Sequence, residues 1–236
     1  MKAVIAITAA LVLAGCASNG VAPRTASCAK PGSDQELALN LADDMANDGR
    51  LYASLANLEG LPEDLVQVRL RKARVLRLMG RNDAEPLYKS LLGTCLAADG
   101  EHGLGQLAAA KNDNAAATEH LERAVKMAPT EAKIRNDLGV VYLNQRKIPE
   151  ARFQFMTAME LRQADSLAAL NMVTLLIYQD NWKQAAELAS MARLSPAQVA
   201  EAQARAERIR GTANKVGMIQ ADHLTEVVDA SSGAIK

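Results

Sequence analysis

Apolar residues recur every three to four positions along most of the chain, from about residue 34 to residue 210. This spacing places them on one face of an α-helix. Glycine, asparagine, aspartate and proline interrupt the pattern at short intervals, which predicts turns between helices. Because short connections join antiparallel neighbours, the pattern predicts an all-α fold. The expected helices are 34–47, 50–59, 63–79, 84–98, 101–111, 114–127, 131–144, 149–162, 166–179, 182–194 and 196–210.

The sequence also repeats itself with a period of 34 residues. The small residues that recur are Ala117, Ala151 and Ala185, then Ala124, Ala158 and Ala192, and also Gly105 and Gly139. A period of 34 residues with two helices per unit resembles the tetratricopeptide repeat (TPR). Several independent series share this period, which favours the repeat over an irregular bundle with coincidental alanines.

The resemblance implies a TPR superhelix, an α-α solenoid of about five helix pairs with a C-terminal capping helix. Helices approach to about 8–10 Å only where the residues in contact are small, which explains the recurring alanine and glycine. Each unit then buries its apolar face against the next unit, because one helix pair has no core of its own.

The start of the chain has the layout of a secretory signal peptide, with Lys2 before an apolar stretch. The stretch ends in Leu13-Ala14-Gly15-Cys16, which resembles the lipobox of bacterial lipoproteins. The resemblance implies cleavage before Cys16 and acylation of its thiol and amine by fatty acids such as palmitate. Ala17 fits sorting to the outer membrane, where the protein would face the periplasm. The alternative is an ordinary signal peptide with a chance cysteine.

These features divide the chain into segments. The expected segments are a lipoprotein signal peptide at 1–15, a flexible lipidated linker at 16–33, divergent TPR-like helix pairs at 34–97, three repeats within 98–199 (98–131, 132–165 and 166–199), a capping helix at 196–211 and a flexible tail at 212–236.

Two cysteines remain once Cys16 is assigned to the lipid. In an oxidising compartment Cys28 and Cys95 are candidates for a disulfide that clips the linker onto the first helices. The alternative is a buried Cys95 and a free Cys28.

Composition and motifs give no indication of catalysis. The chain has 27 basic and 27 acidic residues, so its charge offers no case for nucleic-acid binding. The three histidines, His102, His120 and His223, lack metal-ligand spacing, and no nucleophile or phosphate-loop motif is present. We therefore expect no catalytic residue, metal or cofactor, with His120 solvated on an exposed helix. A hydrolase or transferase that uses His102 or His120 is the competing hypothesis.

A TPR array binds its partners in a concave groove lined by positions 2, 5, 9 and 12 of the first helix of each unit. The candidate protein-binding residues are His102, Gln106, Lys133, Asn136, Val140, Leu143, Leu167, Leu170, Thr174 and Ile177. This groove changes from polar to apolar toward the C-terminus, which would suit a peptide with apolar anchors. Alternatively, the helix at 196–210 or the tail covers the apolar end.

Basic residues crowd the helix expected at 63–79 and the turn that follows it. They are Arg69, Arg71, Lys72, Arg74, Arg77 and Arg81. We interpret them mainly as a solvated helix face. Contact with lipid headgroups, peptidoglycan or an acidic partner is the alternative, and nearby acidic residues such as Asp43 and Glu63 are candidates to pair with them.

The central repeat contains Arg135-Asn136-Asp137-Leu138-Gly139-Val140-Val141-Tyr142, followed by Glu150-Ala151. Together with the lipobox, this stretch resembles the TadD-like TPR lipoproteins of tight-adherence (Flp) pilus assembly. The resemblance implies a scaffold on the outer membrane whose partners are pilus assembly proteins, including the secretin. The alternative is a TPR lipoprotein adaptor for a periplasmic protease or a peptidoglycan enzyme.

Overall fold

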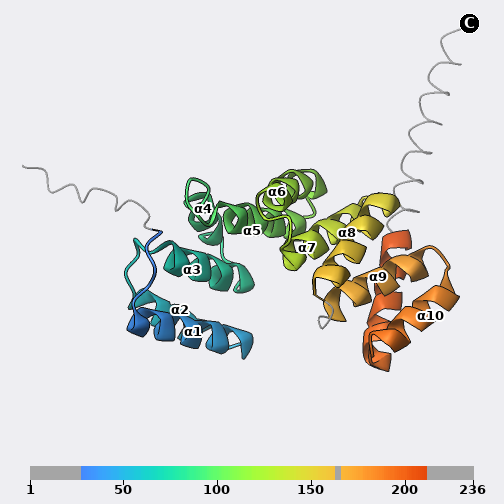
Figure 1. The fold of residues 1–236 in the computed structure, drawn as a ribbon, viewed down its shortest axis with the longest axis horizontal. Coiled ribbons are helices and arrows are strands. Elements are labelled where there is room, and N and C mark those ends of the chain that lie inside the picture. Colours follow the sequence, from blue (N-terminus) through green and yellow to red (C-terminus); the bar gives the residue numbers. More distant parts are fainter. Residues whose placement is uncertain (1–27, 163–165, 212–236) are drawn as a thin grey trace, which may run out of the picture.

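The computed structural model describes residues 28–162 and 166–211, which form helices joined by turns, with no strand among them. The helices are α1 (Ser33–Asn47), α2 (Leu51–Glu59), α3 (Val66–Leu78), α4 (Ala84–Lys89), α5 (Ala97–Ala110), α6 (Asn114–Met127), α7 (Ala132–Asn144), α8 (Ile148–Leu161), α9 (Ser166–Tyr178) and α10 (Trp182–Met191). A last helix covers residues 196–211. The helices follow one another along an arch (Figure 1).

The predicted all-α solenoid is confirmed. Consecutive helices pair as α1 with α2, α3 with α4, α5 with α6, α7 with α8, and α9 with α10. The core is correspondingly distributed along the arch. One packed cluster joins α6 through α10 to the last helix, and two smaller clusters fill α1–α5. This is the packing expected when each pair buries its apolar face against the next.

Glycines lie at two close helix crossings in the regular repeats. A Cβ added at Gly105 of α5 would lie 2.6 Å from Cγ of Leu121 in α6. A Cβ at Gly139 of α7 would lie 2.6 Å from the ring of Phe155 in α8. The period therefore places a residue without a side chain where a large residue of the partner helix crosses, as the packing argument predicts.

The second upstream pair differs from the expected helices. The helix predicted at 84–98 ends at Lys89, and residues 90–96 form turns before α5 begins at Ala97. In these turns the Thr94 hydroxyl donates to the carbonyl oxygen of Leu91 at 2.7 Å and accepts from the Leu96 N–H at 3.1 Å. The side chain thus replaces backbone helix bonds, which explains the break.

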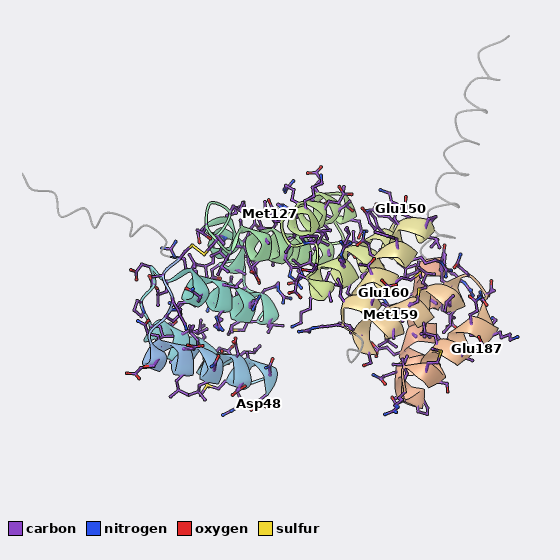
Figure 2. All side chains as sticks on the ribbon, viewed as in Figure 1. Asp48, Met127, Glu150, Met159, Glu160 and Glu187 are labelled. Atoms are coloured by element: carbon purple, nitrogen blue, oxygen red, sulfur yellow. A yellow bond between two sulfur atoms is a disulfide. The ribbon has the colours of Figure 1, made fainter. Side chains whose placement is uncertain are left out.

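The structure joins Cys28 and Cys95 in a disulfide, with Cα atoms 6.1 Å apart (Figure 2). The Cys95 N–H donates to Sγ of Cys28 at 3.1 Å, and the amide of Gln67 donates to the Ala29 carbonyl at 3.2 Å. The segment before α1 is thereby attached to the α4–α5 connection and to α3. The proposed signal peptide, Cys16 and the tail at 212–236 lie outside the described residues.

The last helix begins with a reciprocal cap. The Ser195 hydroxyl accepts from the Gln198 N–H at 3.3 Å, and the Gln198 side chain accepts from the Ser195 N–H at 2.8 Å. Ala202, Ala206 and Ile209 then enter the large cluster. The helix therefore occupies the place of the first helix of a further unit. The described helices are too short or too polar for any of them to cross a lipid bilayer.

Candidate functional site

The apolar end of the predicted groove is closed. Leu143, Thr174 and Ile177 are fully buried, and Leu143 and Ile177 belong to the cluster that includes the last helix. Arg210 of that helix donates to the carbonyl oxygens of Ile177 and Tyr178 at 2.6 and 2.9 Å. Of the two alternatives for this end, coverage by the helix at 196–210 therefore holds, and these positions are not open to a ligand.

Most other predicted groove residues near this end are also buried or hydrogen-bonded within the protein. Val140 and Leu170 are partly buried against the large cluster, whereas Leu167 stays 47% exposed. Asn171 accepts a hydrogen bond from Arg205 at 2.8 Å and donates one to Asn136 at 2.8 Å. Because Asn136 is buried in this network, it stabilises the packing of the repeats and is not available to a ligand.

The polar end of the predicted groove is organised around Asp137. Its Oδ2 atom is 2.7 Å from Nε2 of His102 and accepts from the Gln106 amide at 2.7 Å. Asn136 donates to Oδ1 at 3.3 Å. Burial raises the pKa of Asp137, but the His102 contact and the two amide donors outweigh it and lower the pKa below its ordinary value. Asp137 thus fixes both groove side chains of α5 through a contact with α7.

Replacing Asp137 by asparagine is expected to lower the free energy of unfolding at pH 7 by about 1–3 kcal/mol, because His102 loses a charged partner. A carboxyl group with a lowered pKa stabilises the fold above its unfolded pKa of about 4, and this contribution disappears as the pH falls through the folded value. The difference between the variant and the parent should therefore shrink between pH 5 and pH 3 in urea unfolding. Asp44→Asn, at an exposed position on α1, is the control. A difference that stays constant with pH would contradict this account.

The other histidine of the described helices is only partly exposed and is paired with a carboxylate, whereas a fully solvated side chain was predicted. His120 Nδ1 lies 2.5 Å from Oε2 of Glu101, which is only 6% exposed. Arg123 donates to both oxygens of Glu101, at 2.7 and 3.1 Å. Burial raises the Glu101 pKa, but these hydrogen bonds and charges lower it overall. The cluster joins α5 to α6 within one repeat.

Neither histidine belongs to a recognisable catalytic arrangement. The hydrogen-bond partners found for them in the described residues are carboxylates, an amide and a guanidinium, with no hydroxyl or thiol nucleophile. In the same part of the chain, no three histidine, cysteine or acidic side chains are placed to hold a metal ion. His223 lies outside the described residues.

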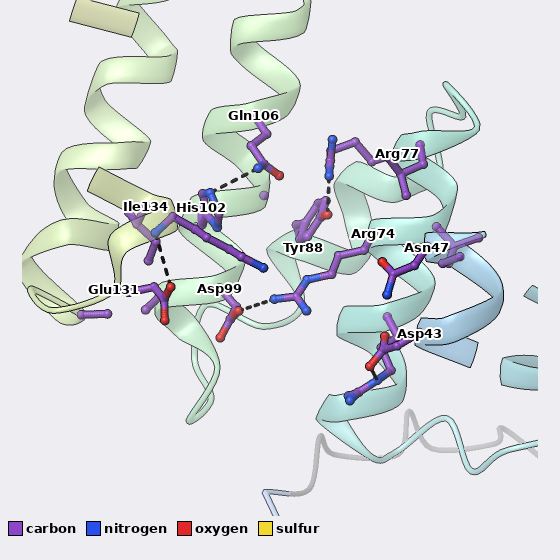
Figure 3. Close-up of a pocket in the computed structure, with 18 of the residues that line it drawn as sticks. Asp43, Asn47, Arg74, Arg77, Tyr88, Asp99, His102, Gln106, Glu131 and Ile134 are labelled. Atoms are coloured by element: carbon purple, nitrogen blue, oxygen red, sulfur yellow. Dashed lines mark hydrogen bonds and ion pairs between the residues drawn. The ribbon is translucent and has the colours of Figure 1, made fainter. Parts of the chain in front are cut away.

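An open groove of about 600 Å³ extends over the N-terminal half of the arch, from α1 to α7. It is lined by α1, α3, α5 and the start of α7, with Tyr88 of α4 (Figure 3). Arg162, which follows α8, also lines it. Three predicted groove residues do line it, namely His102, Gln106 and Lys133. The size is in the range of ligand-binding clefts.

The part of this groove contributed by α1 and α3 was not predicted from the sequence. Arg74 reaches across to Asp99 at 2.7 Å, and Arg71 contacts Asp43 at 2.9 Å. The basic residues of α3 were interpreted mainly as solvated, but Arg71, Arg74 and Arg77 line the groove. Their spacing of three residues is a signal for a single face, and the expected pairing with nearby acidic residues is confirmed for Arg71 and for Lys72, which contacts Glu63 at 2.9 Å.

Comparisons with known proteins agree with this architecture. No family model matches the chain. The TPR repeat-containing protein PA4299 of Pseudomonas aeruginosa is 41% identical over 208 residues, which cover 87% of this chain and 85% of that protein. The solved structure of TTC0263, a thermophilic TPR protein of Thermus thermophilus, superposes with a TM-score of 0.57 at 18% identity, covering 74% of this chain and 97% of the other. YrrB, described as a TPR protein with an unusual peptide-binding site, gives a TM-score of 0.50 at 19% identity, covering 70% and 90%.

Proposed function

Because the chain belongs to the TPR repeat-containing proteins, we propose that it is a non-enzymatic scaffold that helps to assemble or localise a tight-adherence (Flp) pilus secretion complex. Binding of other proteins is the role that a TPR array supports. The finer assignment is supported by the resemblance of residues 135–142 and of the lipobox to TadD-like lipoproteins.

The observation that carries this proposal is the open groove between α1, α3, α5 and α7. It is a concave groove with a volume of about 600 Å³, and hydrogen bonds hold its polar side chains in place. YrrB, which has this fold, is described as having a peptide-binding site. A chain segment of the partner, such as an extended or helical stretch of the secretin, would fit a site of this kind.

Anchoring to the inner leaflet of the outer membrane is the second part of the proposal. It is supported by Leu13-Ala14-Gly15-Cys16 and by Ala17. Several acyl chains on Cys16 would hold the protein on the membrane, because one chain alone binds only marginally. Residues 17–27 and the disulfide at Cys28 would then set how far the helices reach into the periplasm.

Affinity purification of the tagged full-length protein from solubilised envelopes tests the function. We expect pilus assembly proteins, including the secretin, to co-purify. Asn47→Trp places a large side chain in the groove and should reduce their recovery at least tenfold. Asn144→Trp, at an exposed position outside the groove lining, is the matched control and should retain them. Recovery of a protease or a peptidoglycan enzyme without pilus proteins would favour the adaptor hypothesis instead.

A further inference from the structure

Polar residues occupy one repeated position in α5, α7, α9 and the last helix. They are His102, Asn136, Asn171 and Arg205, which follow one another at intervals of 34, 35 and 34 residues. Asn136 and Asn171 are only 4% and 3% exposed. Because burying an amide without a hydrogen-bond partner costs free energy, each of these side chains depends on the helix next to it.

The hydrogen bonds of these residues form a continuous chain that ends at Asp137. Nη1 of Arg205 donates to Oδ1 of Asn171 at 2.8 Å, and Nδ2 of Asn171 donates to Oδ1 of Asn136 at 2.8 Å. Nδ2 of Asn136 donates to Oδ1 of Asp137 at 3.3 Å. Each amide therefore accepts on the side of Arg205 and donates on the side of Asp137. The chain has a single direction, from a cation to an anion.

This shared direction lets the two charged ends of the chain stabilise each other. Aligned hydrogen bonds polarise one another, and they are electrostatically stronger in a protein interior than in water. Burial lowers the pKa of the Arg205 guanidinium, and the negative charge of Asp137 acts against that decrease. The charge of Asp137 thus affects Arg205 although two amide side chains separate them.

The other end of the chain reaches the open groove. The second oxygen of Asp137, Oδ2, is 2.7 Å from Nε2 of His102 and accepts from the Gln106 amide at 2.7 Å. His102 and Gln106 both line the groove (Figure 3). The orientation of Asp137 therefore sets that of two groove side chains, and Asn136 fixes Asp137.

Packing alone does not account for an arginine at position 205. The last helix is already held by Ala202, Ala206 and Ile209, which enter the large cluster, and by Arg210. A methionine would fill the space of Arg205 without taking a charge out of water, which costs free energy. An arginine, in contrast, supplies a charged donor to the chain of amides.

We propose that Arg205 is a positioning residue, which fixes His102 and Gln106 in the groove through this chain of hydrogen bonds. The polar end of the groove then depends on the helix that covers its apolar end. The proposal goes beyond the proposed function, because it concerns this protein alone and holds for any partner that the groove binds.

Selective chemical modification of histidine tests the proposal. Diethyl pyrocarbonate acylates an accessible imidazole nitrogen, and peptide mass spectrometry measures the rate at each histidine of the full-length protein in detergent. Arg205→Met keeps an apolar stem but removes the charge and the donor. We expect modification of His102 to become about threefold to tenfold faster, the factor that corresponds to one lost hydrogen bond, because Asp137 no longer holds Nε2 firmly. His120, bound to Glu101 outside the chain, should keep its rate and is the reference within the same molecule.

Three further variants separate positioning from a loss of stability. Arg205→Lys keeps a charged donor and should retain most of the protection, whereas Arg208→Met removes an exposed arginine of the same helix and should change neither rate. Asn171→Ala interrupts the chain in its middle and should accelerate modification of His102 as Arg205→Met does. Combining Asn171→Ala with Arg205→Met should add little to the larger single effect, because both changes break one chain.

Circular dichroism and the melting temperature verify that each variant is folded. If Asn171→Ala does not fold, the comparison of Arg205→Met with Arg205→Lys decides. Equal acceleration at His102 and His120 would overturn the proposal, because it would reflect a general loosening of the fold. An unchanged His102 rate in folded Arg205→Met would also overturn it, as would equal acceleration by Arg208→Met.

The result is independent of the pilus assignment. Selective acceleration at His102 supports the positioning role even if no pilus protein co-purifies, and that failure would refute only the proposed function. Co-purification of pilus proteins with no selective change at His102 would refute only the positioning role.

Discussion

Replacing Phe155 by alanine is expected to lower the free energy of unfolding by about 3–5 kcal/mol. Phe155 is fully buried on α8, and its ring lies where a side chain at Gly139 would be. Truncation leaves a cavity at this crossing, and Gly139 has no side chain that could fill it. Because the α7–α8 pair joins the units before and after it in one packed cluster, the loss should reach both neighbours.

Phe153→Ala is the matched control for this prediction. Phe153 lies on the same helix two residues earlier but is 61% exposed, so its truncation should change the unfolding free energy by no more than about 0.5 kcal/mol. Urea unfolding followed by circular dichroism compares the two variants. Similar losses for both would show that α8 does not pack through the face described here.

Removing the disulfide by Cys95→Ser is expected to cost about 4 kcal/mol under oxidising conditions. The bridge closes a loop with a sequence separation of 67 residues, and the entropy that it removes from the unfolded chain increases with loop length. The loop contains α1–α4, so the loss should be concentrated there. Amide hydrogen exchange should show faster exchange in α1–α4, while α7–α10 should change little.

Cys28→Ser and the double variant are the controls. All three variants lack the same bridge, so their stabilities should agree within about 0.5 kcal/mol. A much larger loss for Cys95→Ser than for Cys28→Ser would mean that Cys95 contributes through burial and not through the bridge. Equal stability of oxidised wild type and all three variants would contradict the prediction.

The repeats could be predicted because the spacing of small residues along the chain determines where neighbouring helices cross. Gly105 and Gly139 recur at the period and occupy equivalent helix crossings, so a sequence pattern translated directly into tertiary contacts. The repeat spacing does not determine what covers the apolar positions of α9. Leu170 and Ile177 suit a ligand and the chain's own last helix equally well, and only the contacts of Ile209 and Arg210 distinguish the two.

The charged groove could not be predicted from the sequence for a different physical reason. Arg74 and Asp99 belong to different helix pairs, and their contact depends on how α3 is placed beside α5. The irregular turns at 90–96 separate these helices in sequence and shift the repeat, so the period gives no register between them. The pairing of His120 could not be predicted for a similar reason, because its contact with Glu101 depends on how α5 packs against α6.

Site-specific photocrosslinking in cell envelopes tests most directly whether the groove binds another protein. A photoreactive residue is placed at Asn47, inside the groove, or at Glu150, on the outer side of α8 (Figure 2). The account predicts a covalent adduct with a pilus assembly protein from position 47 and none from position 150. An adduct from position 150 alone would contradict it, because the partner would then bind the outer surface of the arch.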